Sequence, residues 1–291
     1  MMSADWTHEQ GVHSYRRYQY TSGYTLTSPL FASDIAAQQQ NVPDLAVFRA
    51  DNRSRYDGLS VHLQGNVSRR FSLILNYTLS SAETWGCVLG ELFDYVNGVC
   101  NPRAAFAKGD YGPSGEDARH RAVLAGTWRA PGGFELAVLS QVESARPFTL
   151  TTPVDVNGLG DALDDRAVVN GIQTSLDQFR GSPYMQTDLR VSRPFTFGDR
   201  WKVTAFAELF NLFNRNNPGN NYIADAAAFS VPVNDLNNIT AFCLNAACTE
   251  TRPVTSLGQL RVPAGALGDF FGPGTTVGIP FAAQIGVRVT F

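Results

Sequence analysis

The chain has 291 residues, of which 44% are hydrophobic and only 17% are charged, and its formal net charge is -3. Globular domains carry about 25% charged residues, so this deficit indicates a surface that does not all face water. The acidic balance gives no basis for a nucleic-acid-binding surface, which would require a basic patch.

The N-terminal segment, residues 1–20, has no cationic stretch followed by an apolar run, so it is not a signal peptide. No stretch of the chain approaches the about 18 consecutive apolar residues of a transmembrane helix. Either the protein is not exported, or the chain is the tail of a longer one.

Apolar residues recur at every second position along most of the chain, which is the periodicity of β-strands with one apolar face. In the segment FSLILNYTLS, Phe71, Leu73, Leu75, Tyr77 and Leu79 share one face. The same alternation predicts strands, in chain order, at residues 57–65, 70–82, 119–130, 133–146, 184–196, 200–213 and 281–291.

Short and long connections alternate between these strands. The segments NVSRR, PGG and FGD are short turns, whereas residues 84–118, 148–183 and 214–279 form long polar connections. This alternation places the short turns at one end of the sheet and the long loops at the other, as in outer-membrane barrels. A strand of about 11 residues tilted by about 45° spans about 25 Å, the height of the apolar belt of such a barrel.

Aromatic residues lie near the ends of the predicted strands, where the interface girdles of a membrane barrel would be. They are Phe71, Trp128, Phe134, Trp201, Phe213 and Phe291. The chain ends in mid-strand on an aromatic residue because that strand would end at the periplasmic interface. The sequence therefore predicts an all-β fold, an antiparallel transmembrane β-barrel of about seven to eight strands, in the outer membrane.

Two C-terminal segments carry a family resemblance. The hairpin YMQTDLRVSRPFTFGDRWKVTAFAELFNLFNRNNPG, with FNLFNR at residues 210–215, is followed much later by QIGVRVTF. Together they resemble the C-terminal barrel of TonB-dependent outer-membrane receptors, in particular the Oar-like group that has a carboxypeptidase-regulatory-like domain. The resemblance covers roughly residues 45–291, with a weaker match at residues 1–25.

The resemblance implies a transporter that takes up a solute, driven by the TonB complex acting on a plug domain. It also implies that the last strand is a signal for the barrel-assembly machinery, through Phe281, Ile285, Val287, Val289 and Phe291. The chain lacks the plug, the energy-coupling box and most of the about 22 strands of plugged transporters. Residues 1–291 are therefore expected to be the C-terminal part of a receptor barrel, and Met1 an internal or misassigned start.

Four cysteines lie in two of the predicted loops. Cys87 and Cys100 share one loop, and Cys243 and Cys248 share another. In an oxidising compartment this arrangement predicts two loop-internal disulfides, and the alternative is four unpaired thiols. No Cys/His spacing indicates zinc.

The segment DVNGLGDALDDR is a weak candidate for a calcium site, with oxygen ligands at Asp155, Asn157, Asp161, Asp164 and Asp165. It departs from an EF-hand loop because Leu159 replaces a ligand and Arg166 occupies the twelfth position. A solvated acidic loop is therefore the favoured interpretation.

Polar residues on the C-terminal strands are expected to face the barrel lumen: Asp188, Arg190, Lys202, Glu208, Gln284 and Arg288. They would either line a wet lumen that contacts a plug or a solute, or form cross-strand pairs that hold register, which we favour. The histidines are scattered, and no motif indicates catalysis or a cofactor, so the chain is not expected to be an enzyme.

The sequence as a whole predicts part of a TonB-dependent transporter barrel, with extracellular loops and lipid, TonB and the assembly machinery as partners. Two alternatives stay open. One is a self-sufficient barrel of about eight strands that serves as an anchor or adhesin. The other is a secreted β-sandwich that binds carbohydrate.

Overall fold

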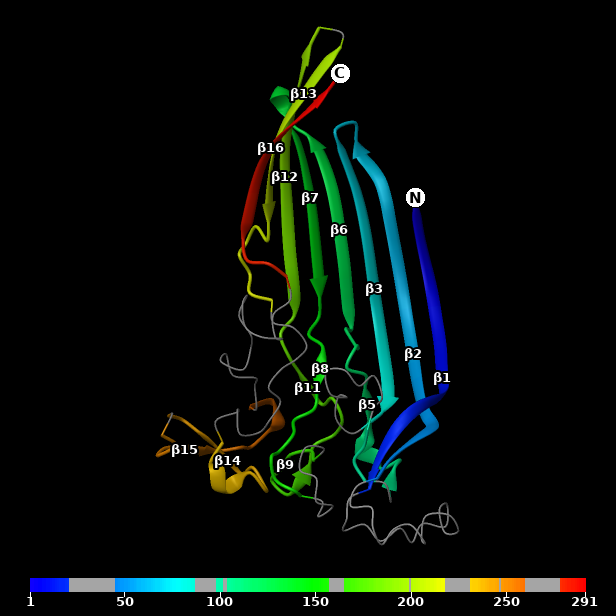
Figure 1. Cartoon of the computed structure of the whole chain (residues 1–291), viewed down its shortest axis with the longest axis vertical. Helices are drawn as coiled ribbons and strands as arrows, with labels where there is room; N and C mark the ends of the chain where they lie inside the picture. Colours follow the sequence, from blue (N-terminus) through cyan, green and yellow to red (C-terminus); the bar gives the residue numbers. More distant parts are fainter. Residues whose placement is uncertain are drawn as a thin grey trace.

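The computed structural model describes residues 1–20, 45–86, 98–101, 104–156, 165–198, 200–217, 231–245, 247–259 and 278–291. Eight long strands of these residues form one antiparallel sheet in the order β16-β13-β12-β7-β6-β3-β2-β1 (Figure 1). They are β1 (Met2–Tyr20), β2 (Leu45–Ser68), β3 (Phe71–Trp85), β6 (His120–Arg129), β7 (Glu135–Glu143), β12 (Tyr184–Phe197), β13 (Trp201–Phe210) and β16 (Ala282–Thr290). Long strands that are neighbours in sequence pair with each other throughout, which is the up-and-down order of a membrane barrel.

All seven predicted strands are present, and the first strand of the sheet was not predicted. In β1 only Met2, Ala4 and Trp6 alternate as apolar residues, and the same face continues with His8 and Gln10. Both faces of the later part of β1 are polar, so this part carries no periodic signal. β2 also begins at Leu45, earlier than predicted, because it pairs with the whole length of β1.

The short turns lie together at one end of the sheet, as predicted. They connect β2 to β3, β6 to β7 through the 3-10 turn η3 (Pro131–Gly133), and β12 to β13. Gly132, Gly133 and Gly198 have positive φ angles, which glycine adopts without a steric penalty. Figure 1 shows these turns at the top and the loop elements at the bottom.

The described parts of residues 98–118, 144–183 and 231–259 form a folded loop layer below the strands. It contains only short elements: β4 (Gly98–Val99), η2 (Lys108–Asp110), β5 (Tyr111–Pro113), β8 (Pro147–Phe148), β9 (Val168–Val169), β10 (Ile172–Gln173), β11 (Phe179–Arg180), η5 (Val233–Asp235), β14 (Ala241–Cys243), β15 (Thr251–Pro253) and η6 (Leu257–Gln259). β8 pairs with β11, β9 with β10, and β14 with β15.

The buried hydrophobic cluster of the described residues lies in this loop layer rather than on the long strands. Its members are Phe148, Leu150, Ala167, Val169, Phe179, Val231, Ile239 and Val254. The loops are therefore held by a core of their own, and the strands are left with exposed apolar side chains.

The sheet has one apolar face and one polar face, as the strand register shows. One row across the sheet points outward and is wholly apolar: Phe71, Trp128, Leu136, Val191, Ala207 and Ile285. The neighbouring row points inward and is mostly polar: Ser72, Thr127, Ala137, Arg190, Glu208 and Gln284. Ile285 is 88% exposed, and a fully exposed side chain of this size costs about 1.5–3 kcal/mol relative to burial. The outward face therefore requires an apolar environment, which a lipid bilayer provides.

Aromatic residues ring the short-turn end of the sheet. Phe71, Trp128, Phe134, Trp201 and Phe291 lie beside the short turns or at the end of β16. The rings of Trp201 and Phe291 lie 5.4 Å apart, centroid to centroid. Phe213 follows β13 and lies instead at the loop end of the sheet.

The sheet does not close on itself within the described residues. β16 pairs there only with β13, and β1 pairs with β2 and with two residues of β4. Figure 1 shows β1 and β16 at opposite edges of one curved layer. The long strands thus form a single sheet and not the two facing sheets of a sandwich. No helix in the described part of the chain is long and apolar enough to cross a membrane.

Candidate functional site

The inner face of the sheet carries a cross-strand polar ladder. The guanidinium of Arg190 donates to Glu208 Oε1 at 2.6 Å, and Glu208 Oε2 accepts from the amide of Gln284. The Arg190 guanidinium also lies 4.3 Å from the centroid of the Phe206 ring. That ring lies against Gly286 on the next strand, where any Cβ would collide with it. Because Gly286 has no side chain, the Phe206 ring can lie flat against the inner face of the sheet.

The remaining predicted inward residues lie on the same face. Asp188 accepts from the backbone N–H of Asn211 at 2.8 Å and from the amide of Gln186 at 3.0 Å. Lys202 and Arg288 share this face with Glu208, as the register of β13 and β16 shows. The structure thus brings the six residues to one wall and pairs four of them with neighbours, as a register-holding ladder does.

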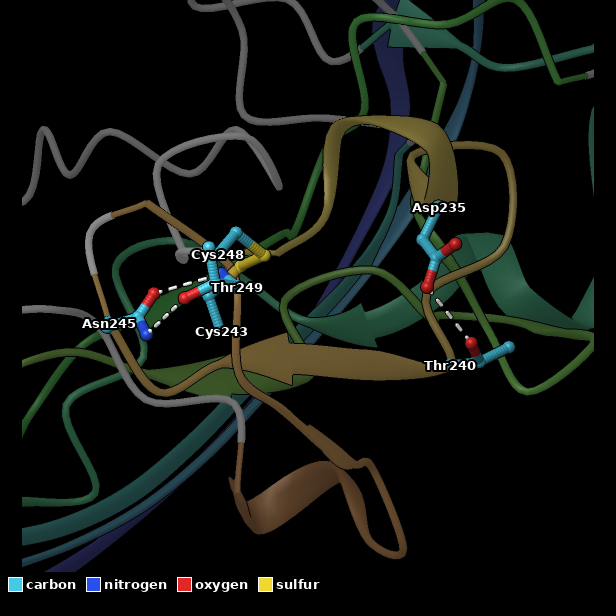
Figure 2. Close-up of a disulfide and its surroundings, with 6 residues drawn as sticks. All are labelled: Asp235, Thr240, Cys243, Asn245, Cys248 and Thr249. Carbon is cyan, nitrogen blue, oxygen red and sulfur yellow. Dashed lines mark hydrogen bonds between the residues drawn. A yellow bond between two sulfur atoms is a disulfide. The ribbon is translucent and has the colours of Figure 1, made fainter.

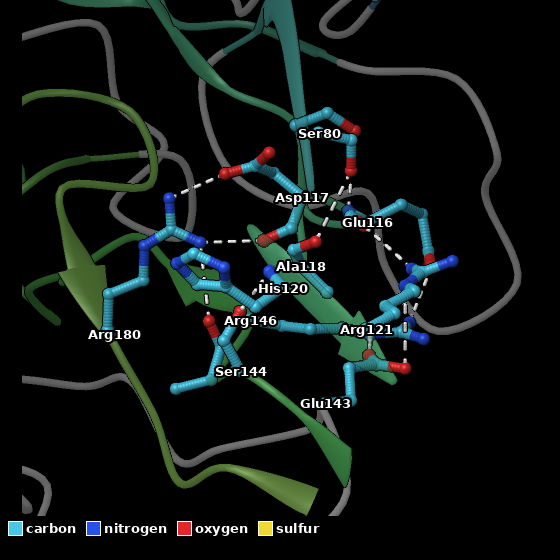
Figure 3. A network of polar contacts seen from close by, with 12 residues as sticks. Ser80, Glu116, Asp117, Ala118, His120, Arg121, Glu143, Ser144, Arg146 and Arg180 are labelled. Carbon is cyan, nitrogen blue, oxygen red and sulfur yellow. Dashed lines mark hydrogen bonds and ion pairs between the residues drawn. The ribbon is translucent and has the colours of Figure 1, made fainter. Parts of the chain in front are cut away.

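A second polar network joins the loop layer to the ends of the strands (Figure 3). Arg146 bridges Glu143 at 2.6 Å and Glu116 at 2.5 Å, and Arg121 contacts the same two residues. Arg180 donates to both the side chain and the backbone carbonyl of Asp117, each at 2.6 Å. These contacts tie the segment around β11 to the ends of β6 and β7.

The buried carboxylate of Asp117 completes this connection. It is 2% exposed, and its second oxygen accepts from the backbone N–H of Ala82 on β3 at 2.9 Å. A carboxylate that accepts both a guanidinium and a backbone N–H is well compensated for its burial. Asp117 and Arg180 therefore fasten the loop layer to the barrel wall.

The most buried ion pair among the described residues joins two loops. Arg166 donates to Asp110 Oδ1 at 2.6 Å, and the two side chains are 4% and 1% exposed. Arg166 also donates to the carbonyl of Gly109 at 2.9 Å. Burial raises the pKa of Asp110 above its usual value, although Arg166 opposes this shift.

Arg16 lies close enough to Asp110 to interact with it electrostatically. It is fully buried at the loop end of β1, and none of its guanidinium nitrogens has a hydrogen-bond partner in the part of the chain that the structure describes. Its guanidinium lies 4.8 Å from the centroid of the Phe106 ring, and burial lowers its pKa. Next to it, Tyr18 donates to Asp51 at 2.6 Å, and burial together with this bond raises the pKa of Tyr18 to about 12.

Asp177 is a buried carboxyl for which we predict a pH effect. It is 3% exposed, it accepts from the Thr149 hydroxyl at 3.0 Å, and burial raises its pKa to about 7. Because the folded state then holds the proton more tightly than the unfolded state, ionisation destabilises the loop layer as pH rises from about 4 to 7. Asp177→Asn has no carboxyl to ionise, so the loop layer should keep its stability as pH rises. Asparagine also tolerates the positive φ of 49° at this position.

Hydrogen exchange of residues 147–180, corrected for the intrinsic pH dependence, measures this effect. The wild type should become less protected between pH 5 and pH 8, whereas Asp177→Asn should not. The same loss of protection in both proteins would show that another group is responsible.

Figure 2 shows the disulfide between Cys243 and Cys248, whose Cα atoms are 4.8 Å apart. Asn245 and Thr249 form two hydrogen bonds with each other inside the same turn, at 2.8 and 3.0 Å. Cys100 is also disulfide-bonded, and Cys87 lies outside the described residues.

We predict that protein exported to the outer membrane contains the disulfides Cys87–Cys100 and Cys243–Cys248. Cys100, Cys243 and Cys248 lie on the loop side of the sheet, and extracellular loops are in an oxidising compartment. Peptide mapping without reduction should recover both cross-linked peptides, and mapping after reduction provides the control. Free thiols at all four positions would contradict the extracellular placement of the loops.

The acidic loop does not present an assembled ligand set in the described residues. Asn157, Asp161 and Asp164 lie outside them, and one oxygen of Asp165 accepts from the backbone N–H of Val156 at 2.6 Å. No group of three metal-ligating side chains occurs in the part of the chain that the structure describes. The histidines are dispersed: His8 contacts Asp57, His62 contacts Asn76, and His120 contacts Tyr77.

A cavity of about 340 Å³ opens where β1, β2 and β3 run toward the loop layer. Its lining includes Glu9, Ser54, Tyr56, Thr84 and Ser114. Neither this cavity nor the buried pairs of the loop layer were identified from the sequence. Arg166 had been noted only as a mismatch in a calcium motif, and its partner lies 56 positions away, so no local spacing connects the two.

Three comparisons relate the chain to known proteins. The profile of a family described as outer membrane beta barrel domain matches residues 1–178. None of the curated proteins matches the chain. Among solved structures, the chain is similar to the outer membrane transporter YddB from Escherichia coli, at 12% identity and a TM-score of 0.42. This similarity covers 77% of the chain but only 27% of that transporter. The family match includes the unpredicted strand β1 and ends before the C-terminal hairpin.

Proposed function

Because the chain belongs to the outer membrane beta barrel domain family and lies in the outer membrane, we propose that it is part of the wall of a TonB-dependent transporter. In this proposal the wall surrounds a lumen for a solute, and the loop layer faces the exterior. The chain has no enzymatic role. The solute is moved by a plug that the TonB complex acts on, and the C-terminal strand is the segment that the barrel-assembly machinery reads.

The observation that carries the proposal is the sheet itself. Within the described residues its edges at β1 and β16 do not pair with each other, and it has one apolar face and one polar face. In lipid every backbone N–H and C=O must be paired, so β1 and β16 each need a further strand or each other. Closure between them would give an eight-stranded barrel, whose interior is only wide enough for side chains. The inner face already carries Phe206 and Arg190, together with the polar ladder. Further strands therefore give a lumen that a plug and a solute can occupy.

Binding to TonB tests the proposal. The full-length protein, purified in detergent, should be retained by the immobilised periplasmic domain of TonB, and a porin of similar size serves as the negative control. Its conductance in a planar bilayer should be low, because a plug fills the lumen. No retention together with a large open conductance would indicate a passive pore. No retention and no conductance would favour the anchor or adhesin.

A further inference from the structure

The cavity beside β1, β2 and β3 is built from the inner face of the wall. The register aligns Glu9, Tyr56 and Ala82 in one row, and Gly11, Ser54 and Thr84 in the next. Ser114 joins them from the loop after β5, where its backbone N–H donates to the carbonyl of Ala82 at 2.8 Å. The cavity thus lies on the lumen side, toward the loop end of the sheet.

Small residues make this part of the wall hollow. Gly11, Ser54, Ala82 and Thr84 occupy four adjacent inward positions, all of them with little or no side chain. A Cβ on Gly11 would lie 2.2 Å from Ser54 Oγ, so this position accepts no side chain without a shift. The cavity is therefore a consequence of the sequence at these positions.

The Tyr56 ring closes the side of the cavity that faces the short-turn end. It folds back along its own strand over Gly58, where a Cβ would lie 2.5 Å from the phenol oxygen. An aromatic ring held flat in this way presents a face on which an apolar surface of a solute can stack.

The polar groups of the lining are mostly neutral. Hydroxyl groups come from Ser54, Thr84 and Ser114, whereas the Gln10 side chain lies on the outward face of β1 and contacts His8. Two charged lining residues already have partners: Arg55 donates to Asp57 at 2.6 Å, and Glu83 accepts from Tyr111 at 2.8 Å. The carboxylate of Glu9 is exposed and has no partner among the described residues.

A carboxylate only accepts hydrogen bonds, so it requires donors on the ligand. Hydroxyl groups of a ligand supply such donors and also pair with the neutral hydroxyls of the wall. The volume lies near the lower limit of ligand pockets, which is about 300 Å³. We propose that this cavity binds a neutral polyhydroxylated solute of the size of a mono- or disaccharide, with its ring on Tyr56 and its hydroxyls on Glu9. This inference rests on the proposed transport function, because the cavity lies on the path of an entering solute.

Saturation-transfer NMR on the full-length protein in detergent tests this site. The probes are glucose, maltose, trehalose and cellobiose, with spermidine and citrate as charged comparisons. At least one sugar should receive saturation, and neither charged compound should compete with it. Ala82→Leu fills the cavity and should weaken sugar binding about tenfold or more, equivalent to at least about 1.4 kcal/mol. Glu9→Gln keeps the shape but loses the charged acceptor, so it should weaken binding severalfold.

Ser60→Leu is the matched control, because Ser60 lies on the same face of β2 outside the cavity and pairs with Thr78 on β3. It should leave sugar binding unchanged, and every variant should keep the heat-modifiable gel mobility of a folded barrel. Failure of all four sugars to bind, with TonB retention intact, would overturn this inference and leave the proposed function standing. Sugar binding that Ala82→Leu does not weaken would place the site elsewhere. Competition by spermidine would show that the site accepts a cation and would overturn the proposal of a neutral ligand.

Discussion

Replacing Val287 with arginine should sharply lower the yield of folded barrel, whereas the same replacement at Gln284 should not. Val287 is 64% exposed on the outward face of β16, where an arginine near the bilayer midplane costs about 2–4 kcal/mol. Gln284 lies on the inward face of the same strand and contacts Glu208. An arginine there gains an ion pair with this carboxylate and stays in the polar lumen.

The measurement is the fraction of heat-modifiable protein in isolated outer membranes, with both variants made in the full-length protein. The two positions are only three residues apart on the same strand. They therefore lie in the same part of the strand but on opposite faces of the sheet. Equal losses for both variants would mean that the assignment of the faces is wrong.

Replacing Arg166 with methionine should unfold the loop layer far more readily than replacing Arg16 with methionine. Removal of Arg166 leaves the carboxylate of Asp110 buried without its partner, which costs about 3–5 kcal/mol. Arg16 is a buried guanidinium that makes no hydrogen bond to the described residues, so an apolar side chain of similar length should be neutral or stabilising. Both substitutions remove one positive charge, which makes them a matched pair.

Protease resistance of the loop layer in the detergent-purified protein checks this contrast. The defect of Arg166→Met should be larger at pH 8 than at pH 4, because burial already raises the pKa of Asp110 and its protonation removes the unpaired charge. A loss of resistance in Arg16→Met as large as that in Arg166→Met would show that the guanidinium of Arg16 stabilises the loops.

The sequence predicted the strands well because the membrane imposes a simple rule on them. An apolar side chain such as Leu189 or Leu209 must alternate with a polar one that faces the lumen, and this period of two is visible locally. β1 was missed because most of its length extends past the apolar belt, where both faces are polar. There, His8 contacts Asp57 on the outward face, and Glu9 lies at the cavity on the inward face.

The loop layer could not be predicted because its contacts join residues that are far apart in sequence. Asp117 and Arg180 are separated by 63 positions, and Thr152 donates to the carbonyl of Leu236 across 84 positions. No periodicity describes such contacts. The cavity escaped prediction for a related reason, since the small residues that form it lie on three strands and meet only through their register.

Distances between β1 and β16 test most directly the central claim that these strands belong to the wall of a larger barrel. Spin labels would be placed on Ile285 and, in separate samples, on the outward-facing Ala4, Trp6, His8 and Gln10 of the full-length protein, with the native cysteines left oxidised. Neighbouring strands lie about 5 Å apart, so several intervening strands predict pulsed electron paramagnetic resonance distances above roughly 20 Å for every pair. A distance below roughly 10 Å for any pair, as expected for adjacent strands, would mean that β1 and β16 close a small barrel and would contradict the account.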